Sequence, residues 1–128
     1  MLSSKQIQMT KIQNSKRYDL EERTLKFARE VRDFVKKLPR ILANIEYGRQ
    51  LIKSSSSVGA NYIEANESFS KKDFVMRIKI CRKEAKESRY WLKLVETNND
   101  SLEKERDELI NEATELMKIF GSMVEKSK

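Results

Sequence analysis

The sequence KKDFVMRIKICRKEAKESRYWLKLV, residues 71–95, decides the fold. Its apolar and small residues recur at alternating intervals of four and three, which is typical of a helix that packs in a bundle. Ser70, followed three residues later by Asp73, resembles a capping box, so the helix is expected to begin at about Lys71. The stripe that we expect to face the core is Phe74, Ile78, Cys81, Ala85, Ser88, Leu92 and Val95.

The same spacing predicts a helix before this segment and another after it. The earlier one is expected from about Leu20, after an Asp19–Glu22 capping pair, to Lys37, with Pro39 marking its end. Its stripe is Leu20, Phe27, Val31, Phe34 and Leu38. The later one follows the turn at 98–100, with Asp100 as its expected N-cap. Its stripe is Leu102, Leu109, Ala113, Leu116, Phe120 and Met123, with Arg106 as the one charged interruption.

The segment from about Asn44 to Ser68 allows two interpretations. The serine run 54–57 and Gly59 are, by composition, typical of a flexible linker. A stripe with intervals of four and three nevertheless continues through the serines, which favours a helix. The members of that stripe are Leu51, Ser55, Val58, Tyr62, Ala65 and Phe69. We predict the helix.

Four helices with short connections favour antiparallel neighbours, so we predict an all-α, up-down-up-down four-helix bundle. This single domain is expected to span residues 18–128. Residues 1–17 show no sustained period and are expected to form a mobile basic tail. Such a tail has two interpretations, plain disorder or contact with nucleic acid. Its basic residues are Lys5, Lys11, Lys16 and Arg17.

The composition excludes several classes of site. The 128 residues include no histidine, so Ser-His-Asp or Cys-His catalysis, mixed His and Cys zinc sites and di-iron carboxylate sites with Glu-x-x-His motifs cannot be built. No glycine-rich phosphate loop, signal sequence or apolar run of membrane-spanning length occurs. The single Cys81 suits a reducing compartment. We therefore expect a cytoplasmic, non-enzymatic protein with no cofactor, metal, membrane or small-molecule substrate, although carboxylate or lysine chemistry stays formally open.

The helix at 71–95 carries two further stripes beside its core stripe. The first holds the only tryptophan, mixed with aliphatic residues and carboxylates, and has two interpretations. It is a seam between subunits of an oligomer, which we favour, or a wide core face that wraps the tryptophan. The predicted oligomer seam is Ile80, Glu84, Glu87, Trp91 and Leu94.

The second additional stripe is entirely basic, and it is predicted to bind nucleic-acid phosphates: Lys79, Arg82, Lys86, Arg89 and Lys93. Basic charge is segregated along the chain. Residues 71–97 contain nine basic and four acidic residues, whereas residues 98–128 contain five basic and eight acidic residues. A run of like charge is also often only a solvated face, so this alternative stays open.

Three motifs carry a resemblance to a known family: QLIKSSSSVGANYIEA at 50–65, SKKDF at 70–74 and KEAKESRYWL at 83–92. Over about residues 18–97 the chain resembles the bacterial four helix bundle protein family, first noticed within intervening sequences of 23S rRNA genes. The last helix matches only in pattern. The resemblance implies a ring-forming homo-oligomer, most often a homopentamer. It also implies a relation to the nucleic-acid-binding accessory protein that works beside the reverse transcriptase of diversity-generating retroelements.

The resemblance implies no catalytic residue. It marks Asn61, Glu64, Glu84 and Glu87 as motif residues, for which hydrogen bonding between helices or subunits is favoured over a ligand site. It also assigns close helix packing to Ser54, Ser55, Gly59 and Ala60. Cys81 is expected to be an inert core thiol.

Two functions are therefore carried forward. The first is an oligomeric accessory factor that binds RNA or DNA without sequence preference, with a reverse transcriptase as a candidate protein partner. The second is a structural scaffold or protein-interaction module with no nucleic-acid role. The basic stripe has few aromatic neighbours, with only Tyr90 close to it, so binding is expected to be directed at the nucleic-acid backbone rather than at the bases.

Overall fold

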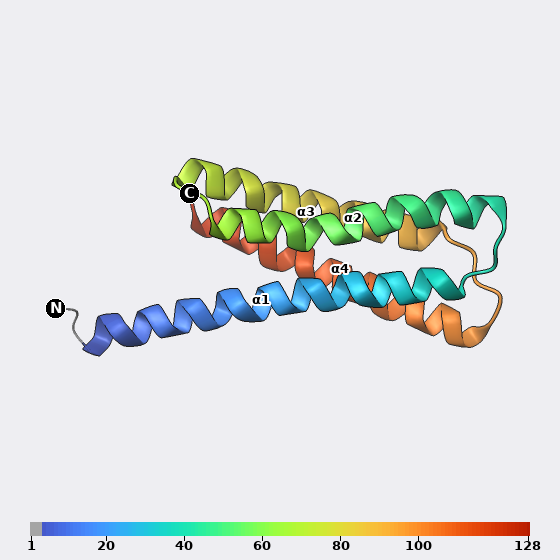
Figure 1. The fold of residues 1–128 in the computed structure, drawn as a ribbon, viewed down its shortest axis with the longest axis horizontal. Helices are drawn as coiled ribbons and strands as arrows, with labels where there is room; N and C mark the ends of the chain where they lie inside the picture. The colour runs from blue at the N-terminus through green and yellow to red at the C-terminus, as the bar shows by residue number, and fades with distance from the viewer. Residues whose placement is uncertain (1–3) are drawn as a thin grey trace.

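The chain folds into four consecutive α-helices in a computed structural model, which describes the backbone of residues 4–128 and the side chains of residues 19–128 (Figure 1). The helices are α1 (Ser4–Lys37), α2 (Leu42–Asn66), α3 (Lys71–Leu94) and α4 (Asp100–Lys126). No strand occurs within residues 4–128. The predicted all-α class and four-helix content are confirmed.

Each helix packs on its neighbours in the chain, and α1 closes the bundle against α4. The diagonal pairs, α1 with α3 and α2 with α4, have no Cα atoms within 8 Å of each other in the described part of the chain. This arrangement is that of an antiparallel up-down-up-down bundle, as predicted. The packing between α1 and α4 is the sparsest of the four neighbouring pairs.

The predicted stripes form the core, with few exceptions. Every predicted member from α1 is buried, and so are the members from α3 between Ile78 and Val95. Phe74 and Met123 lie at the margin, half-buried, and Val124 takes the buried position beside Met123. The predicted core position of Phe69 is wrong, because its side chain is fully exposed (104%) in the turn that follows α2. The stripe ends at Ala65 because the helix itself ends at Asn66.

The start of the first helix differs from the prediction. The helix expected from Leu20 begins at Ser4, so Asp19 does not mark its N-terminus. No glycine or proline precedes Pro39 to end a helix, which is the physical reason that the helix can extend so far back. The side chains of the predicted tail, 1–17, lie outside the described residues, and its mobility stays a prediction.

The caps of α3 and α4 follow from single side chains. Ser70 caps α3 as predicted, its Oγ accepting a hydrogen bond of 3.1 Å from the backbone N–H of Asp73. For α4 the predicted cap is wrong by one position. Asn99, not Asp100, is the N-cap, and its Oδ1 accepts a bond of 2.9 Å from the N–H of Leu102.

The serine run at 54–57 is helical, so the predicted helix is confirmed and the flexible-linker interpretation is wrong. Ser54 is buried against α3, where its Oγ lies 2.9 Å from the Oγ of Ser88. Ser55 is also buried. Gly59 lies against α1, since a Cβ built on it would sit 2.9 Å from Oγ1 of Thr24. Ala60 is exposed, so its predicted role in close packing is wrong.

Candidate nucleic-acid interface

The basic stripe of α3 runs along the edge of the bundle that faces α4. Lys79, Lys86 and Lys93 are exposed, whereas Arg82 and Arg89 are half-buried. The side chain of Arg82 passes Gly121 of α4. Nη1 of Arg89 donates a hydrogen bond of 3.4 Å to Oγ1 of Thr114. The stripe is therefore three free lysines with two arginines whose stems pack on the neighbouring helix.

No carboxylate among residues 19–128 lies within 4.0 Å of the cationic groups of these five side chains. A helix rises about 1.5 Å per residue, so the stripe is about 21 Å long between Lys79 and Lys93. Aligned cations without carboxylate partners attract a polyanion along this whole length.

Two glutamates of the acidic helix α4 are directed away from the stripe, towards α1. Glu112 accepts two hydrogen bonds from Arg23, of 2.8 and 2.7 Å. Glu105 accepts from Nζ of Lys37 at 2.6 and 2.7 Å. The hydrogen bond that Arg23 donates to Glu112 raises the pKa of Arg23, an effect that burial opposes. These pairs hold the sparse α1–α4 side together and leave the opposite edge of α4 free of their charge.

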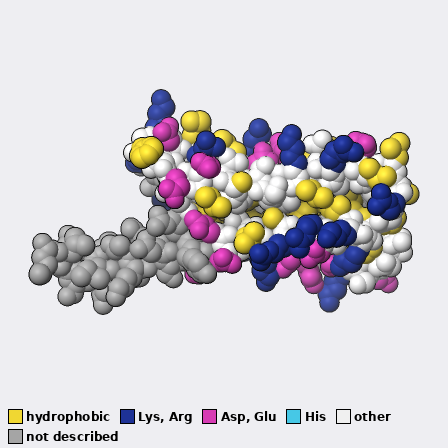
Figure 2. Space-filling view, in the orientation of Figure 1, with side chains coloured by type: hydrophobic (Ala, Val, Ile, Leu, Met, Phe, Trp, Pro, Cys, Tyr) yellow, Lys and Arg dark blue, Asp and Glu magenta, His cyan; other side chains and the backbone are white. Residues whose placement is uncertain are grey.

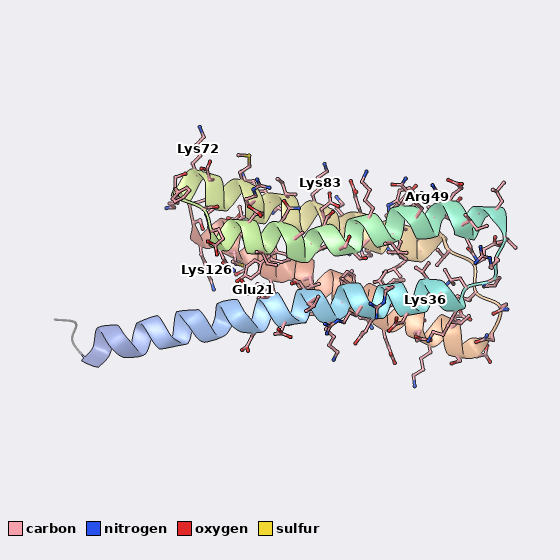
Figure 3. All side chains as sticks on the ribbon, in the orientation of Figure 1. Glu21, Lys36, Arg49, Lys72, Lys83 and Lys126 are labelled. Carbon is pink, nitrogen blue, oxygen red and sulfur yellow. The ribbon has the colours of Figure 1, made fainter. Side chains whose placement is uncertain are left out.

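The sequence did not identify a second group of residues at the α2–α3 end of the bundle. Phe69 is exposed in the turn, and Met76 is exposed one turn inside α3. Two surface hollows adjoin there, of about 330 and 520 Å³. Lys79, the first member of the basic stripe, lines the larger hollow. Lys72, which lines the same hollow, projects outward at this end in Figure 3. The 4-3 pattern assigned Phe69 to the core, and so it concealed this site.

The predicted seam lies on the edge of α3 that faces α2. Trp91 is half-buried and stacks on Tyr47 of α2, with ring centroids 5.9 Å apart. Tyr90 meets the same ring edge-on at 5.1 Å. Of the other members, Ile80, Glu84 and Leu94 are half-buried and Glu87 is exposed. Trp91 thus has a partner within the same chain, as the wide-core interpretation requires, and keeps a partly exposed face.

Glu84 is the most unusual member of this stripe. Its carboxylate has no Lys or Arg within 4.0 Å among the described side chains. Burial raises the pKa of Glu84, and the neighbouring charge of Glu87 raises it further. Lys83 and Lys53 oppose this shift. The carboxylate is therefore poorly stabilised in the single chain.

A second exposed apolar surface, not anticipated from the sequence, lies along the outer edge of α2. Its isoleucines are between two-fifths and one-half exposed, and Figure 2 shows hydrophobic side chains with Lys and Arg beside them on the face that α1 and α2 present. At one end a hollow of about 310 Å³ is lined by apolar residues together with Lys36, Arg40 and Arg49. The exposed apolar residues of α2 and its N-cap are Ile41, Leu42, Ile45, Ile52 and Ile63, and Leu25 of α1 is exposed as well.

One of the four motif residues has an interhelical role. Asn61 of α2 accepts a hydrogen bond of 3.0 Å from Nη1 of Arg77 in α3 and donates one of 2.8 Å to the carbonyl of Ser57. The side chains of Glu64, Glu84 and Glu87 take part in no hydrogen bond with the described residues. Hydrogen bonding between subunits stays a prediction for them.

Cys81 is fully buried, and burial raises the pKa of its thiol to about 12. The expected core thiol is confirmed. Within residues 19–128, no three Cys, Asp or Glu side chains gather in a way that could hold a metal ion. None of the described helices combines the length and hydropathy needed to cross a bilayer.

Comparison with known proteins identifies a family and a solved structure to which this chain is similar. The sequence profile of one family, described as 23S rRNA-intervening sequence protein, matches residues 16–122. The chain belongs to this family. The match extends through most of α4, further than the motifs at 50–92 indicated. Membership of the 23S rRNA-intervening sequence family confirms the resemblance seen in the sequence.

A solved structure has the same fold. It is the crystal structure of a protein of unknown function from the S23 ribosomal protein family of Bacteroides thetaiotaomicron, 27% identical, with a TM-score of 0.70. The alignment covers 81% of this chain and 96% of that one. Among curated proteins none matches this member of the 23S rRNA-intervening sequence family.

Proposed function

We propose that this protein is a non-enzymatic, oligomeric accessory factor that binds RNA or DNA without sequence preference. The observation that carries the proposal is the basic stripe of α3, whose five cations have no carboxylate within 4.0 Å in the described part of the chain. Lysine and arginine bind phosphate oxygens and read no base sequence through them. The family's association with rRNA genes by name supports a nucleic acid as the partner.

The basic stripe would bind phosphates along one strand or across a groove. A length of about 21 Å passes several phosphates, and each neutralised phosphate releases counterions. Affinity should therefore fall steeply as the salt concentration rises, and by a similar factor for unrelated sequences. A ring of subunits would repeat the stripe and strengthen binding through avidity.

The test replaces Arg82, Lys86 and Arg89 together with glutamine and measures binding to random RNA and DNA across a salt titration. A matched control, R29Q/K36Q/K104Q, removes three exposed cations from α1 and α4. We expect the stripe variant to lose most of the affinity and of the salt slope, and the control to keep them. Equal losses in the two variants, or no binding by the unmodified protein at low salt, would overturn the proposal. Circular dichroism and the oligomer mass check that each variant is intact.

We further propose that the protein forms a closed homo-oligomer through the seam around Trp91, with a pentamer as the favoured state. Glu84 is half-buried and has no Lys or Arg within 4.0 Å among residues 19–128, which supports a neighbouring subunit that supplies a cation. Native mass spectrometry of W91A tests this seam. The matched control is I52S/I63S, which alters exposed apolar residues on α2 instead. Loss of the oligomer is expected for W91A only, and a monomeric unmodified protein would contradict it.

The second function is the scaffold or protein-interaction module. The exposed isoleucines of α2 favour it, because an apolar surface with a polar rim is typical of protein–protein contact. If nucleic-acid binding is absent and I52S/I63S alone dissolves the assembly, this function takes precedence.

A further inference from the structure

We propose that the α2–α3 end of each bundle holds one unstacked nucleobase, so that the ligand is single-stranded nucleic acid. This inference rests on the proposed function, because it extends the basic stripe to a base-binding site. Of the five phenylalanines, three are fully buried and Phe74 is half-buried. Only Phe69 exposes its whole ring to solvent, at the tip of the turn that joins α2 to α3.

One exposed aromatic ring is ordinary, and the argument depends on what surrounds it. Phe69 and Met76 line a hollow of about 330 Å³, whose other walls are polar. These apolar walls suit the flat face of a base, because each of the bases can stack on an aromatic ring. The polar walls are Glu64, Glu67, Ser68, Asp73 and Arg77.

The polar walls suit the edge of a base. Carboxylates accept hydrogen bonds from the exocyclic amino groups of bases, and Arg77 supplies a donor for base carbonyls and ring nitrogens. Arg77 does not swing freely, because its Nη1 is already bonded to Oδ1 of Asn61 at 3.0 Å. The hollow therefore has both parts that an unpaired base needs, a stacking face and a hydrogen-bonding edge.

The second hollow connects this site to the basic stripe. It measures about 520 Å³, adjoins the first through Met76, and is lined by Lys71, Lys72, Val75 and Lys79. Lys79 is also the first residue of the stripe. A strand whose phosphates follow α3 from Lys93 to Lys79 meets Lys71 and Lys72 next, and its base can then reach Phe69. In a duplex the bases stay stacked inside the helix and do not reach it.

An anionic membrane is the competing ligand for an exposed phenylalanine beside lysines. Three carboxylates, Glu64, Glu67 and Asp73, line the hollow at Phe69. A bilayer would press them against a continuous anionic surface, where like charges repel, whereas a single strand can keep its phosphates at Lys71 and Lys72 and insert only an uncharged base. The same carboxylates are useful acceptors for a base. The charge around Phe69 thus favours the single strand over the bilayer.

The test compares F69A with the unmodified protein in fluorescence anisotropy, using an unstructured single-stranded oligonucleotide and the duplex of the same sequence. Loss of the stacking ring should weaken single-strand binding by F69A roughly tenfold, which corresponds to about 1.4 kcal/mol. Duplex binding should change less than about twofold, since it uses phosphate contacts alone. F69W should bind the single strand as well as the unmodified protein. The control L42A removes an exposed apolar side chain from the opposite end of α2 and should change neither affinity.

A second readout follows the base itself. 2-Aminopurine in the oligonucleotide loses fluorescence when it stacks on an aromatic ring, so quenching is expected with the unmodified protein and not with F69A. Unchanged single-strand affinity in F69A, with binding still lost in R82Q/K86Q/R89Q, would overturn the base site and leave the proposed function standing. No binding of either nucleic acid at low salt would overturn both. Binding to phosphatidylserine vesicles that requires Phe69, without preference for the single strand, would also overturn the base site.

Discussion

The side chain of Asn44 bonds both backbone groups of Glu96, 52 residues away. Its Oδ1 accepts from the N–H of Glu96 at 2.8 Å, and its Nδ2 donates to the carbonyl of Glu96 at 2.9 Å. Nδ2 also donates to the carbonyl of Pro39 at 3.0 Å. Asn44 is only 3% exposed. One amide thus joins the α1–α2 and α3–α4 connections, which lie at the same end of the bundle (Figure 1).

Asn44→Ala should therefore destabilise the fold although Asn44 lies outside the apolar core. The substitution leaves the N–H of Glu96 and the carbonyls of Glu96 and Pro39 without this partner, at a cost of about 1–3 kcal/mol. Urea denaturation followed by circular dichroism measures the loss. Asn111→Ala, at an exposed position of α4, is the matched control and should change stability little. Equal stabilities of the two variants would show that the amide does not hold the connections.

The surroundings of Gly59 and Gly121 predict opposite effects on stability when each glycine is replaced by alanine. A Cβ on Gly59 would lie 2.9 Å from Oγ1 of Thr24, whose hydroxyl is bonded to the carbonyls of Leu20 and Glu21. Gly59→Ala should destabilise by about 1 kcal/mol, because overpacking outweighs the gain in helix propensity. A Cβ on Gly121 would have its nearest neighbour, Cδ of Arg82, at 3.8 Å, so Gly121→Ala should stabilise by about 0.5–1 kcal/mol.

The free energies of unfolding of the two alanine variants check this contrast. Adding Thr24→Ala to Gly59→Ala should recover part of the loss, since the double variant removes the closest atom. A stabilising Gly59→Ala would mean that α1 and α2 move apart at no cost.

The periodicity of apolar residues was sufficient to predict the number of helices, their order and most of the core. It succeeded through the serine run because Ser54 and Ser55 occupy core positions at which two helices approach. It failed at Phe69, where the pattern continues but the helix does not. A period describes a face only as long as the helix lasts, and no glycine or proline marks this end of α2.

The candidate site was predictable only in part. The five cations of α3 share a face in any α-helix, so spacing alone located them. Their lack of carboxylate partners depends on where the glutamates of α4 point, which spacing does not specify. Asn44, Thr24 and the isoleucines of α2 were missed for a similar reason. Their roles arise from contacts between segments far apart in the sequence.

Cys81 should be chemically silent in the folded protein. The thiolate is the reactive form, and burial raises the pKa of this thiol to about 12, so almost none forms at pH 8. We expect no reaction with Ellman's reagent in the native state and one equivalent after denaturation in guanidinium chloride. The reaction rate under native conditions would then report the opening of the core. Rapid native labelling would contradict the buried position.

Glu84 should make stability depend on pH in a defined direction. Burial, and then the charge of Glu87, raises the pKa of Glu84 in the folded state above its ordinary value in the unfolded chain. The folded state therefore binds this proton more tightly, and the ionised carboxylate opposes folding once the pH rises above the folded pKa. Below the unfolded pKa this penalty is absent.

In the separated monomer, where no neighbouring subunit supplies a cation, Glu84→Gln should accordingly stabilise the fold at pH 7, and the gain should disappear on acidification through the carboxyl range. Thermal unfolding at pH 7 and at pH 3.5, for this variant and the unmodified protein, measures it. Glu87→Gln should give a smaller gain of the same sign, since it removes only the repulsion. A gain that grows on acidification would contradict the assignment.

The sparse packing between α1 and α4 means that the four helices do not open with equal ease. Detaching α1 exposes its contact with α2 and breaks the two ion-pair bridges to α4, while the packing of α2 on α3 and of α3 on α4 is retained. The last three helices thus form the more persistent unit, and α1 is the element released first by thermal fluctuation. The amide hydrogens of α1 then exchange with solvent ahead of those of α3, the helix that carries the basic stripe.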